Sequence, residues 1–425
     1  MSRVLIKDGC VLTLDPRIGN LRRGDVLIED GRIAEVGVDL RARDAEVIDA
    51  SQSIVMPGFC DTHRHVWKSL FRNSGEGAGP FEYGPHYQPE DVYAATLAGL
   101  FGGAEAGITT VVDWADFAQG NAYTDAAIEA HLDSGMRTVF THSSPGWDLA
   151  PGSWGPDLRR VVGQPRSPLT TVAAAARVAD DWALARELGL RVHVHAGTGD
   201  SDIHVVADLA EQRLLASDVT LVHCSLLRRP DFEAIASSGA GVSVCPSSEM
   251  VKGLQPPIQM MVDLGIEPGL GVDTERLASG DIFAQMRATI SLQHARSFDL
   301  KLAGKAGLPR LMTTRDVIRF GTLEGARAVG LSAVTGSLEP GKQADIVVLR
   351  TDRPNIFPVN DPIGAVVWGM DTSNVDWVLV GGRALVADGE LQTDVARVRG
   401  LALDAQHRVV EAAGLMAGTR SGGPQ

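Results

Sequence analysis

Apolar and polar positions alternate differently at the two ends of the chain and in its middle. Residues 4–55 contain short apolar runs separated by the Asp-Gly pairs 8–9 and 30–31, and residues 344–391 return to this pattern, with Gly381-Gly382 between two apolar runs. Asp-Gly and Gly-Gly pairs accept the positive φ angles that a tight hairpin needs. The pattern therefore predicts antiparallel hairpins at both ends of the chain.

The middle of the chain, residues 56–337, alternates short apolar runs with longer amphipathic or Ala-rich stretches. Residues 89–107 predict a helix, because Pro89 is at a first-turn position and Gly107 follows the end. Eight strands are predicted, over residues 56–63, 107–114, 136–142, 169–176, 190–195, 219–223, 241–245 and 268–273. Strands that alternate with helices in this number predict an α/β fold, a (β/α)8 TIM-type barrel, rather than an open sheet.

The fourth of these strands is ambiguous. Residues 170–188 read equally well as one helix of roughly twenty residues, because alanine has the highest helix propensity. We favour the strand, since it completes the barrel. With the barrel over residues 56–337, residues 1–55 and 338–395 are predicted to form one small β-sandwich from both termini, and residues 396–425 a C-terminal helix and tail.

Composition narrows the class of protein. The net charge is −14, from 39 basic and 53 acidic residues, which argues against a nucleic-acid partner or a surface held to anionic lipid. Hydrophobic residues make up 44% of the chain, yet no apolar run approaches the roughly 18 residues of a membrane span. The four cysteines are far apart, so buried free thiols are expected. These features predict a cytoplasmic protein with a small-molecule substrate; the oligomeric state stays open, a homo-oligomer included.

The ends of the predicted strands carry the candidate chemistry. In a barrel, the C-terminal ends of the strands meet at one mouth, where active sites are built. The titratable residues at these ends are His63, His65, Asp113, His142, His195, His223 and Asp273. Any one of these histidines alone reads as a hydrogen-bonded core residue, but five of the chain's eleven histidines at strand ends indicate a site.

Three of these histidines and one aspartate form a predicted metal site. His63 and His65 are two residues apart on a strand, so their side chains point the same way. His195 ends the fifth strand, and Asp273 ends the eighth, which neighbours the first in a closed barrel. Three imidazoles and a carboxylate, with one open position, are typical of a catalytic divalent metal, zinc above all. His223, at the end of the sixth strand, is expected to orient water or substrate beside the ion.

The order of the motifs resembles a known family. PGFCDTHRH, HVHAG, LVHCSLL, CPSSEM and GLGVD resemble the amidohydrolase superfamily, in particular its branch of cytosine deaminase-like, guanine deaminase-like and triazine hydrolase-like proteins. The resemblance implies that His63, His65, His195 and Asp273 are metal ligands and that His223 is a catalytic histidine beside them. Because no lysine ends the fourth strand, one divalent ion is expected, Zn²⁺ first and Fe²⁺ as the alternative. Water activated by this ion would attack the substrate, and Asp273 would transfer the proton.

The sequence departs from that branch at one position. Deaminases of the branch usually carry a glutamate three residues after the histidine of strand five, as the acid that protonates the ring nitrogen, and here this position is Thr198. A hydroxyl cannot perform that transfer, although it can hold substrate or water. Asp200, Glu249 and Glu275 are candidate replacements. The other option is that Asp273 alone accepts the proton from the attacking water and passes it to the leaving group.

Contacts to the substrate are predicted from the residues around the metal motif. Trp67 follows the two histidines and Trp114 ends the second strand, so both read either as walls for a flat heterocycle or as plain packing. Asp116 and Phe117 in the next loop are further candidate contacts. Residues 75–91, rich in glycine and proline, read as a lid over the mouth or as a surface loop.

The leading functional hypothesis is a metal-dependent hydrolase that attacks a C–N bond of a small cyclic or heteroaromatic molecule, by deamination or by amide-type hydrolysis. Two alternatives are also enzymes: a ring-opening cyclic amide hydrolase, and a triazine-type hydrolase that removes chloride or an alkylamine. A third alternative is a metal-binding homologue with impaired catalysis. The presence of all four ligands and of His223 argues against this last alternative.

Overall fold

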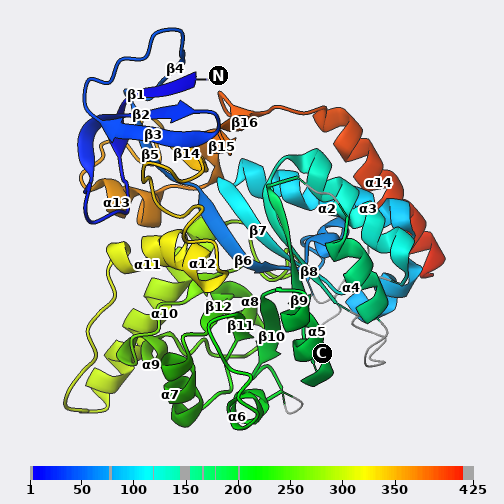
Figure 1. The fold of residues 1–425 in the computed structure, drawn as a ribbon. Helices are drawn as coiled ribbons and strands as arrows, with labels where there is room; N and C mark the ends of the chain where they lie inside the picture. The colour runs from blue at the N-terminus through cyan, green and yellow to red at the C-terminus, as the bar shows by residue number, and fades with distance from the viewer. Residues whose placement is uncertain are drawn as a thin grey trace, which may run out of the picture.

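Two sheets organise the chain in the computed structural model, which describes residues 3–75, 79–117, 119–143, 154–164, 167–177, 179–199 and 202–414. An eight-stranded parallel sheet forms the barrel, and a mixed nine-stranded sheet is built from both chain ends. In Figure 1 the blue N-terminal strands and the orange C-terminal strands lie together beside the barrel. The predicted α/β barrel with a small β unit from both termini is confirmed.

The barrel strands follow one another in chain order. They are β6 (Phe59–Arg64), β7 (Ile108–Ala115), β8 (Arg137–His142), β9 (Thr170–Ala175), β10 (Val192–Ala196), β11 (Val219–His223), β12 (Gly241–Val244) and β13 (Gly269–Leu270). The first and last strands meet just beyond their ends, where Asp273 N–H donates to the carbonyl of His63 and His65 N–H donates to the carbonyl of Asp273, both at 2.8 Å. This contact closes the barrel at the mouth.

The ambiguous fourth strand is a strand. Residues Thr170–Ala175 pair in parallel with β8, and a separate helix, α5 (Ala179–Glu187), begins after them. Val172 and the alanines that follow are buried on both faces of the sheet, as expected for a central parallel strand. Pairing with neighbours therefore overrides the helix propensity of the alanines.

Helices surround the barrel. The larger ones are α2 (Pro89–Glu105), α3 (Asn121–Ser134), α4 (Gly155–Val162), α6 (Val205–Glu211), α7 (Arg229–Ser238), α8 (Pro246–Val251), α9 (Ile258–Asp263), α10 (Ile282–Leu302), α11 (Thr314–Phe320) and α12 (Leu323–Ala328). The predicted helix at 89–107 is α2. None of the described helices is long and apolar enough to cross a membrane.

Residues 75–91 pack against the barrel where the structure describes them. The short helices η1 (Val66–Phe71), α1 (Pro80–Tyr83) and η2 (Gly84–His86) precede α2, and the rings of Tyr83 and Tyr87 are fully buried. Residues 76–78 lie outside the described part. None of the described side chains of residues 79–91 lines the cavity at the mouth, which gives no support to the lid; exposed residues such as Pro85 and Gln88 alternate here with the two buried tyrosines.

The terminal sheet joins the two ends of the chain. Its strands are β1 (Arg3–Val11), β2 (Leu21–Glu29), β3 (Arg32–Gly37), β4 (Glu46–Asp49), β5 (Ser53–Pro57), β14 (Ile346–Arg350), β15 (Val375–Val380), β16 (Arg383–Ala387) and β17 (Glu390–Leu391). The two halves meet where β5 pairs antiparallel with β14. Short segments α13 (Pro362–Gly364), η3 (Ala365–Gly369) and η4 (Thr372–Asn374) connect β14 to β15.

Two sequence predictions for this sheet need correction. The Asp8-Gly9 pair lies inside β1 as an irregularity in its pairing with β2, not in a hairpin turn. The strand predicted at 56–63 is divided: Met56 pairs with Val347 in the terminal sheet, and the barrel strand begins at Phe59. Gly58 marks the crossing, since a Cβ atom there would lie 2.1 Å from Cγ2 of Thr109.

The C-terminal helix covers the barrel from outside. Helix α14 (Val395–Ala412) packs along α2, and Nη2 of Arg408 lies 2.5 Å from Oδ1 of the buried Asp91. In Figure 1 this helix is the red element beside α2 and α3. The four cysteines are free thiols; Cys60, Cys224 and Cys245 are buried, as predicted, whereas Cys10 is half-buried.

Candidate metal-dependent active site

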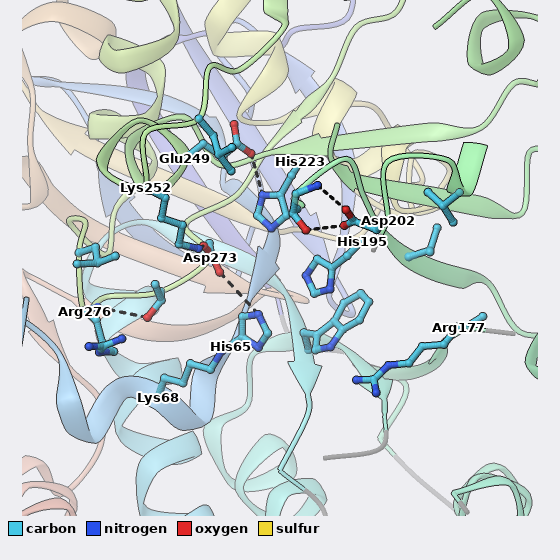
Figure 2. A pocket seen from close by; sticks show the side chains of 18 of the residues that line it. His65, Lys68, Arg177, His195, Asp202, His223, Glu249, Lys252, Asp273 and Arg276 are labelled. Atoms are coloured by element: carbon cyan, nitrogen blue, oxygen red, sulfur yellow. Dashed lines mark hydrogen bonds and ion pairs between the residues drawn. The ribbon is translucent and has the colours of Figure 1, made fainter. Parts of the chain in front are cut away.

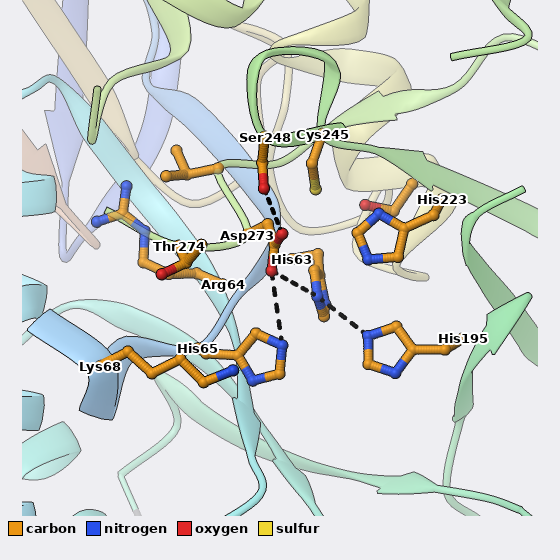
Figure 3. A network of polar contacts seen from close by, with 12 residues as sticks. His63, Arg64, His65, Lys68, His195, His223, Cys245, Ser248, Asp273 and Thr274 are labelled. Atoms are coloured by element: carbon orange, nitrogen blue, oxygen red, sulfur yellow. Dashed lines mark hydrogen bonds and ion pairs between the residues drawn. The ribbon is translucent and has the colours of Figure 1, made fainter. Parts of the chain in front are cut away.

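Four histidines and an aspartate converge at the mouth of the barrel (Figure 3). His63 lies on β6 and His65 directly after it, His195 lies on β10, His223 ends β11, and Asp273 follows β13. All are buried except His195, which is half-buried. Because the five side chains come from four different strands, closure of the barrel is what brings them together.

The distances from His63 and His65 to the neighbouring ligand atoms are close to those that one metal ion requires. The Nε2 atoms of His63 and His195 are 3.3 Å apart, and Oδ1 of Asp273 lies 3.8 Å from Nε2 of His63 and 3.6 Å from Nε2 of His65. Two nitrogens bound to one tetrahedral zinc ion at about 2.05 Å are about 3.3 Å apart. Nitrogen and carboxylate donors at this spacing are the donor set that zinc prefers, so the residues present fit the predicted metal.

Asp273 presents its two oxygens to different partners. Oδ1 faces the histidines, whereas Oδ2 accepts hydrogen bonds from Ser248 Oγ at 2.5 Å and from Lys252 Nζ. Burial raises the pKa of Asp273, but Lys252 and the histidines outweigh it and hold the pKa well below its usual value. Asp273 is therefore an anion with one oxygen directed to the metal position and the other held by two donors. The sequence analysis missed Ser248 and Lys252, which lie on α8 or directly after it.

His223 is oriented by a buried acid. Its Nδ1 lies 2.8 Å from Oε1 of Glu249, and the same oxygen accepts a 2.8 Å hydrogen bond from the backbone N–H of Cys245. With Nδ1–H donated to the carboxylate, Nε2 is the ring nitrogen left for the cavity. His223 and Asp273 have φ angles of 75° and 65°, a strained backbone conformation that is typical of functional sites. Glu249, a predicted acid, thus lies where it positions His223.

His65 is held in the same way from the opposite side. Its Nδ1 lies 2.8 Å from Oδ1 of Asp116, which also accepts a 2.6 Å hydrogen bond from Trp67 Nε1. Nζ of Lys68 lies 3.8 Å from the other oxygen of Asp116. Burial raises the pKa of Asp116, but His65, Lys68 and the Trp67 hydrogen bond outweigh it and hold the pKa well below its usual value. Asp116 therefore fixes His65 with Nε2 toward the metal position.

A cavity of about 840 Å³ opens beside these residues (Figure 2). Its inner wall contains Trp114, whose ring centroid lies 4.0 Å from that of His195. A cavity of this size accommodates molecules of drug size. The other charged or hydroxyl-bearing lining residues are Lys68, Arg177, Thr198, Asp202, His204, Asp208, Glu249, Lys252, Thr274 and Arg276.

Thr198 is paired with an acid that the sequence analysis missed. Asp202 accepts hydrogen bonds from the backbone N–H groups of Thr198, at 2.9 Å, and Gly199, at 2.8 Å, and from the Thr198 hydroxyl. Both Thr198 and Asp202 line the cavity. The one signal in the sequence was the short spacing of a threonine and an aspartate in a turn. Asp200, a predicted candidate, lies outside the described residues.

The predicted site residues that do not line the cavity include Glu275, Trp67 and Phe117. Glu275 accepts hydrogen bonds from Ser69 Oγ at 2.7 Å and from Arg72 Nη2 at 3.0 Å, and so ties the loop after β13 to η1. The rings of Trp67 and Phe117 are fully buried and pack edge to face at 6.1 Å. The structure therefore assigns Glu275 and Phe117 to packing around the site, and Trp67 to the hydrogen bond with Asp116 described above. Of the two tryptophans, Trp114 is the one in the cavity wall.

The remaining strand-end residues pair with helices outside the metal cluster. Asp113 Oδ2 lies 3.0 Å from His131 Nε2, and Asp157 Oδ2 lies 2.8 Å from His142 Nε2. Burial raises the pKa of Asp157, but hydrogen bonds, first from His142 and then from Thr124, outweigh it and hold the pKa at about 2. These two pairs attach β7 to α3 and β8 to α4.

Curated proteins of similar sequence include deaminases. A 5'-deoxyadenosine deaminase of Methanosarcina mazei is 28% identical over 423 residues, which cover 91% of this chain and 94% of the relative. A 5-methylthioadenosine/S-adenosylhomocysteine deaminase of Symbiobacterium thermophilum is 28% identical, with the same coverage of both chains.

Solved structures of similar fold include zinc-bound hydrolases. An adenosine deaminase from Xanthomonas campestris with bound zinc superposes with a TM-score of 0.83 at 20% identity, covering 96% of this chain and 99% of that one. A mutant atrazine chlorohydrolase from Arthrobacter aurescens TC1, with zinc and atraton, gives 0.84 at 20% identity, covering 95% and 100%. The model of the Amidohydrolase family matches residues 54–385, most of the chain. This protein therefore belongs to the Amidohydrolase family.

Proposed function

We propose that the protein is a zinc-dependent hydrolase of C–N bonds other than peptide bonds, and that it releases ammonia from a purine-like heterocycle. The observation that carries the proposal is the cluster of His63, His65, His195 and Asp273 beside a cavity large enough for a nucleoside. Curated relatives that match over nine tenths of the chain are named as adenosine-derivative deaminases. The choice of zinc over iron rests on the donor set and on the zinc in two structural neighbours.

The residues around the metal position have separable roles in this proposal. When bound, a divalent ion supplies an acidified water as the nucleophile. Nε2 of His223, with Nδ1 held by Glu249, faces the substrate and hydrogen-bonds the reacting group. The ring of Trp114 provides a flat wall on which a heterocycle stacks. Asp273, held as an anion, anchors the ion through Oδ1.

Proton transfer to the substrate is assigned to Thr198 and Asp202 together. Of the acids that line the cavity, Glu249 is engaged by His223 and Asp273 by Lys252, which leaves Asp202 and Asp208. Asp202 is hydrogen-bonded to the Thr198 hydroxyl, at the position where related deaminases carry a glutamate. A proton can pass from a carboxyl group to a substrate nitrogen through one intervening hydroxyl.

Ammonia release tests the proposed function. Zinc-loaded protein is incubated with adenosine, 5'-deoxyadenosine, 5'-methylthioadenosine, guanine, pterins and triazines, and ammonia is measured by a coupled assay. We expect ammonia from at least one amino-substituted ring, and a loss of about 100-fold in its rate in Asp202→Asn, the size of effect typical of a lost general acid. Turnover with no ammonia from any ring would refute the deaminase assignment.

A second function is supported by one observation, the absence of a glutamate at position 198. An enzyme that opens cyclic amides does not need a separate acid at this position, and neither does removal of chloride or an alkylamine from a triazine. Dihydropyrimidines, hydantoins and chlorotriazines in the same panel cover these alternatives. Zinc binding without turnover of any compound would favour the metal-binding homologue.

A further inference from the structure

Two lysines line the cavity next to the metal position. Lys68 follows His65 on η1, and Lys252 follows α8 and contacts Asp273. In Figure 2 both lie on the side of the cavity that holds His65 and Asp273, whereas Arg177 lies on the opposite side. Two ammonium groups beside a metal centre are unexpected in a chain with a net charge of −14.

Lys68 is a half-buried cation in the cavity wall with an incomplete set of acceptors. Its side chain is 11% exposed, and its Nζ lies 3.8 Å from Oδ2 of Asp116, beyond hydrogen-bond distance. An ammonium group has three donors, and within the described part of the chain Lys68 Nζ has no hydrogen-bond acceptor. Burial lowers the pKa of Lys68; Asp116 and Asp273 raise it and Lys252 and Arg276 lower it, without cancelling the effect of burial. The donors of Lys68 are therefore open to a negatively charged group of a ligand in the cavity.

The acids near the two lysines are already engaged. Asp116 accepts hydrogen bonds from His65 and Trp67. Oδ2 of Asp273 is shared between Ser248 and Lys252, and its Oδ1 faces the metal ligands. With a divalent ion in place, the inner wall holds more positive charge than these carboxylates balance. Such a wall binds an oxygen group with negative charge far better than a neutral one, because the interaction is poorly screened inside a cavity.

We propose that Lys68 and Lys252 bind a carboxylate group of the substrate, and that the substrate is therefore an N-heterocycle that carries a carboxylate close to the reacting carbon. The inference rests on the proposed function, since it places the reacting carbon beside the metal ligands. It goes beyond that function by naming a charged substrate class. Lys252 has a side chain that is 40% exposed, so it is the more accessible of the two lysines. Lys68, with a side chain that is 11% exposed, supplies the second positive charge of the site.

Binding of a matched pair of ring compounds tests this proposal without turnover. The probes are pyridine-3-carboxylate and 3-(hydroxymethyl)pyridine, which share the ring nitrogen and differ in the negative charge. Titration calorimetry with the zinc-loaded protein is expected to show that the carboxylate binds at least about 10-fold more tightly. The preference should fall to about 2-fold or less in Lys68→Met and in Lys252→Met, with zinc content measured in each variant.

Two control variants separate the explanations. Lys305→Met removes a positive charge from an exposed site outside the cavity, so it should keep the full preference. Arg177→Met tests the opposite wall. The proposal is overturned if the preference for the carboxylate probe disappears in Arg177→Met and survives in both lysine variants. It is also overturned if the preference survives in every variant, because the ion alone then holds the carboxylate. Since the readout is binding, an enzyme that releases ammonia from neutral rings but shows no preference would refute this inference and leave the proposed function intact.

Discussion

Replacement of Asp116 tests how the protein orients a metal ligand. In Asp116→Asn the carboxylate that accepts hydrogen bonds from His65 Nδ1, at 2.8 Å, and Trp67 Nε1, at 2.6 Å, becomes a neutral amide. A hydrogen bond to a charged group contributes about 1.5–3 kcal/mol and one between neutral groups about 0.5–1.5 kcal/mol. The change therefore costs about 1–2 kcal/mol of the free energy that holds His65 in place.

This loss should appear in zinc affinity. A cost of about 1–2 kcal/mol corresponds to a zinc Kd that is about 5–30-fold weaker, at the lower end of the effects seen when the partner of a ligating histidine is removed. Competition between the protein and a fluorescent zinc chelator measures this Kd, and the melting temperature shows that the variant is folded.

Asp202→Asn is the matched control for this experiment. It makes the same chemical change at a residue that lines the cavity, but the partners of Asp202 are Thr198 and Gly199 rather than a metal ligand. Its zinc Kd should stay within about 2-fold of the unchanged protein. A folded Asp116→Asn variant with unchanged zinc affinity, or an equal loss in Asp202→Asn, would refute the reasoning.

Three further predictions follow from other contacts. Glu249→Gln should lower kcat about 10-fold with KM and zinc content little changed, because it weakens the hydrogen bond that positions His223; a lower zinc content would contradict this. Asp157→Asn should lower the free energy of unfolding by about 1 kcal/mol at pH 7, because solvent around this partly exposed carboxylate weakens the effect of the pKa shift. The pKa of Asp157 is lowered in the folded state, so its contribution is present above about pH 4 and lost as pH falls toward 2. Urea unfolding should show a smaller difference in the free energy of unfolding between the unchanged protein and the variant at pH 3 than at pH 7. An equal difference at both pH values would exclude the lowered pKa of Asp157 as its cause. Gly58→Ala should destabilise the fold by about 1–3 kcal/mol, because its Cβ would lie 2.1 Å from Thr109; an unchanged melting temperature would contradict the crossing described at this residue.

The order of strands along the sequence predicts which residues meet at the mouth. His63, His195 and Asp273 are far apart in sequence, but each lies near or just beyond the C-terminal end of a strand, and parallel barrel strands bring these ends to one rim. Their convergence can therefore be predicted from the order of the strands, without knowledge of how the side chains pack. Trp114 could be placed in the cavity wall for the same reason, because it lies near the end of β7.

Residues beyond the strand ends were harder to place, because the regular alternation of side chains stops there. Trp67 lies two residues after His65, but the chain has entered the 3-10 helix η1, which turns the ring into the packed core. Glu275 follows Asp273 by two residues, but Asp273 has a positive φ, and the Glu275 side chain contacts Ser69 rather than the cavity. Lys252 and Asp202 reach the site from a helix end and a turn, for which the sequence offers no fixed spacing.

Metal content is the measurement that tests the central claim most directly. The protein purified from zinc-supplemented medium, and its His195→Ala variant, are dialysed and analysed by inductively coupled plasma mass spectrometry. Because His195 and His63 present Nε2 atoms 3.3 Å apart at the mouth of the barrel, we expect one equivalent of zinc per chain, and less than about a tenth in a folded His195→Ala variant. Less than about half an equivalent in the unchanged protein, or full zinc content in the variant, would contradict the metal site on which the proposed function depends.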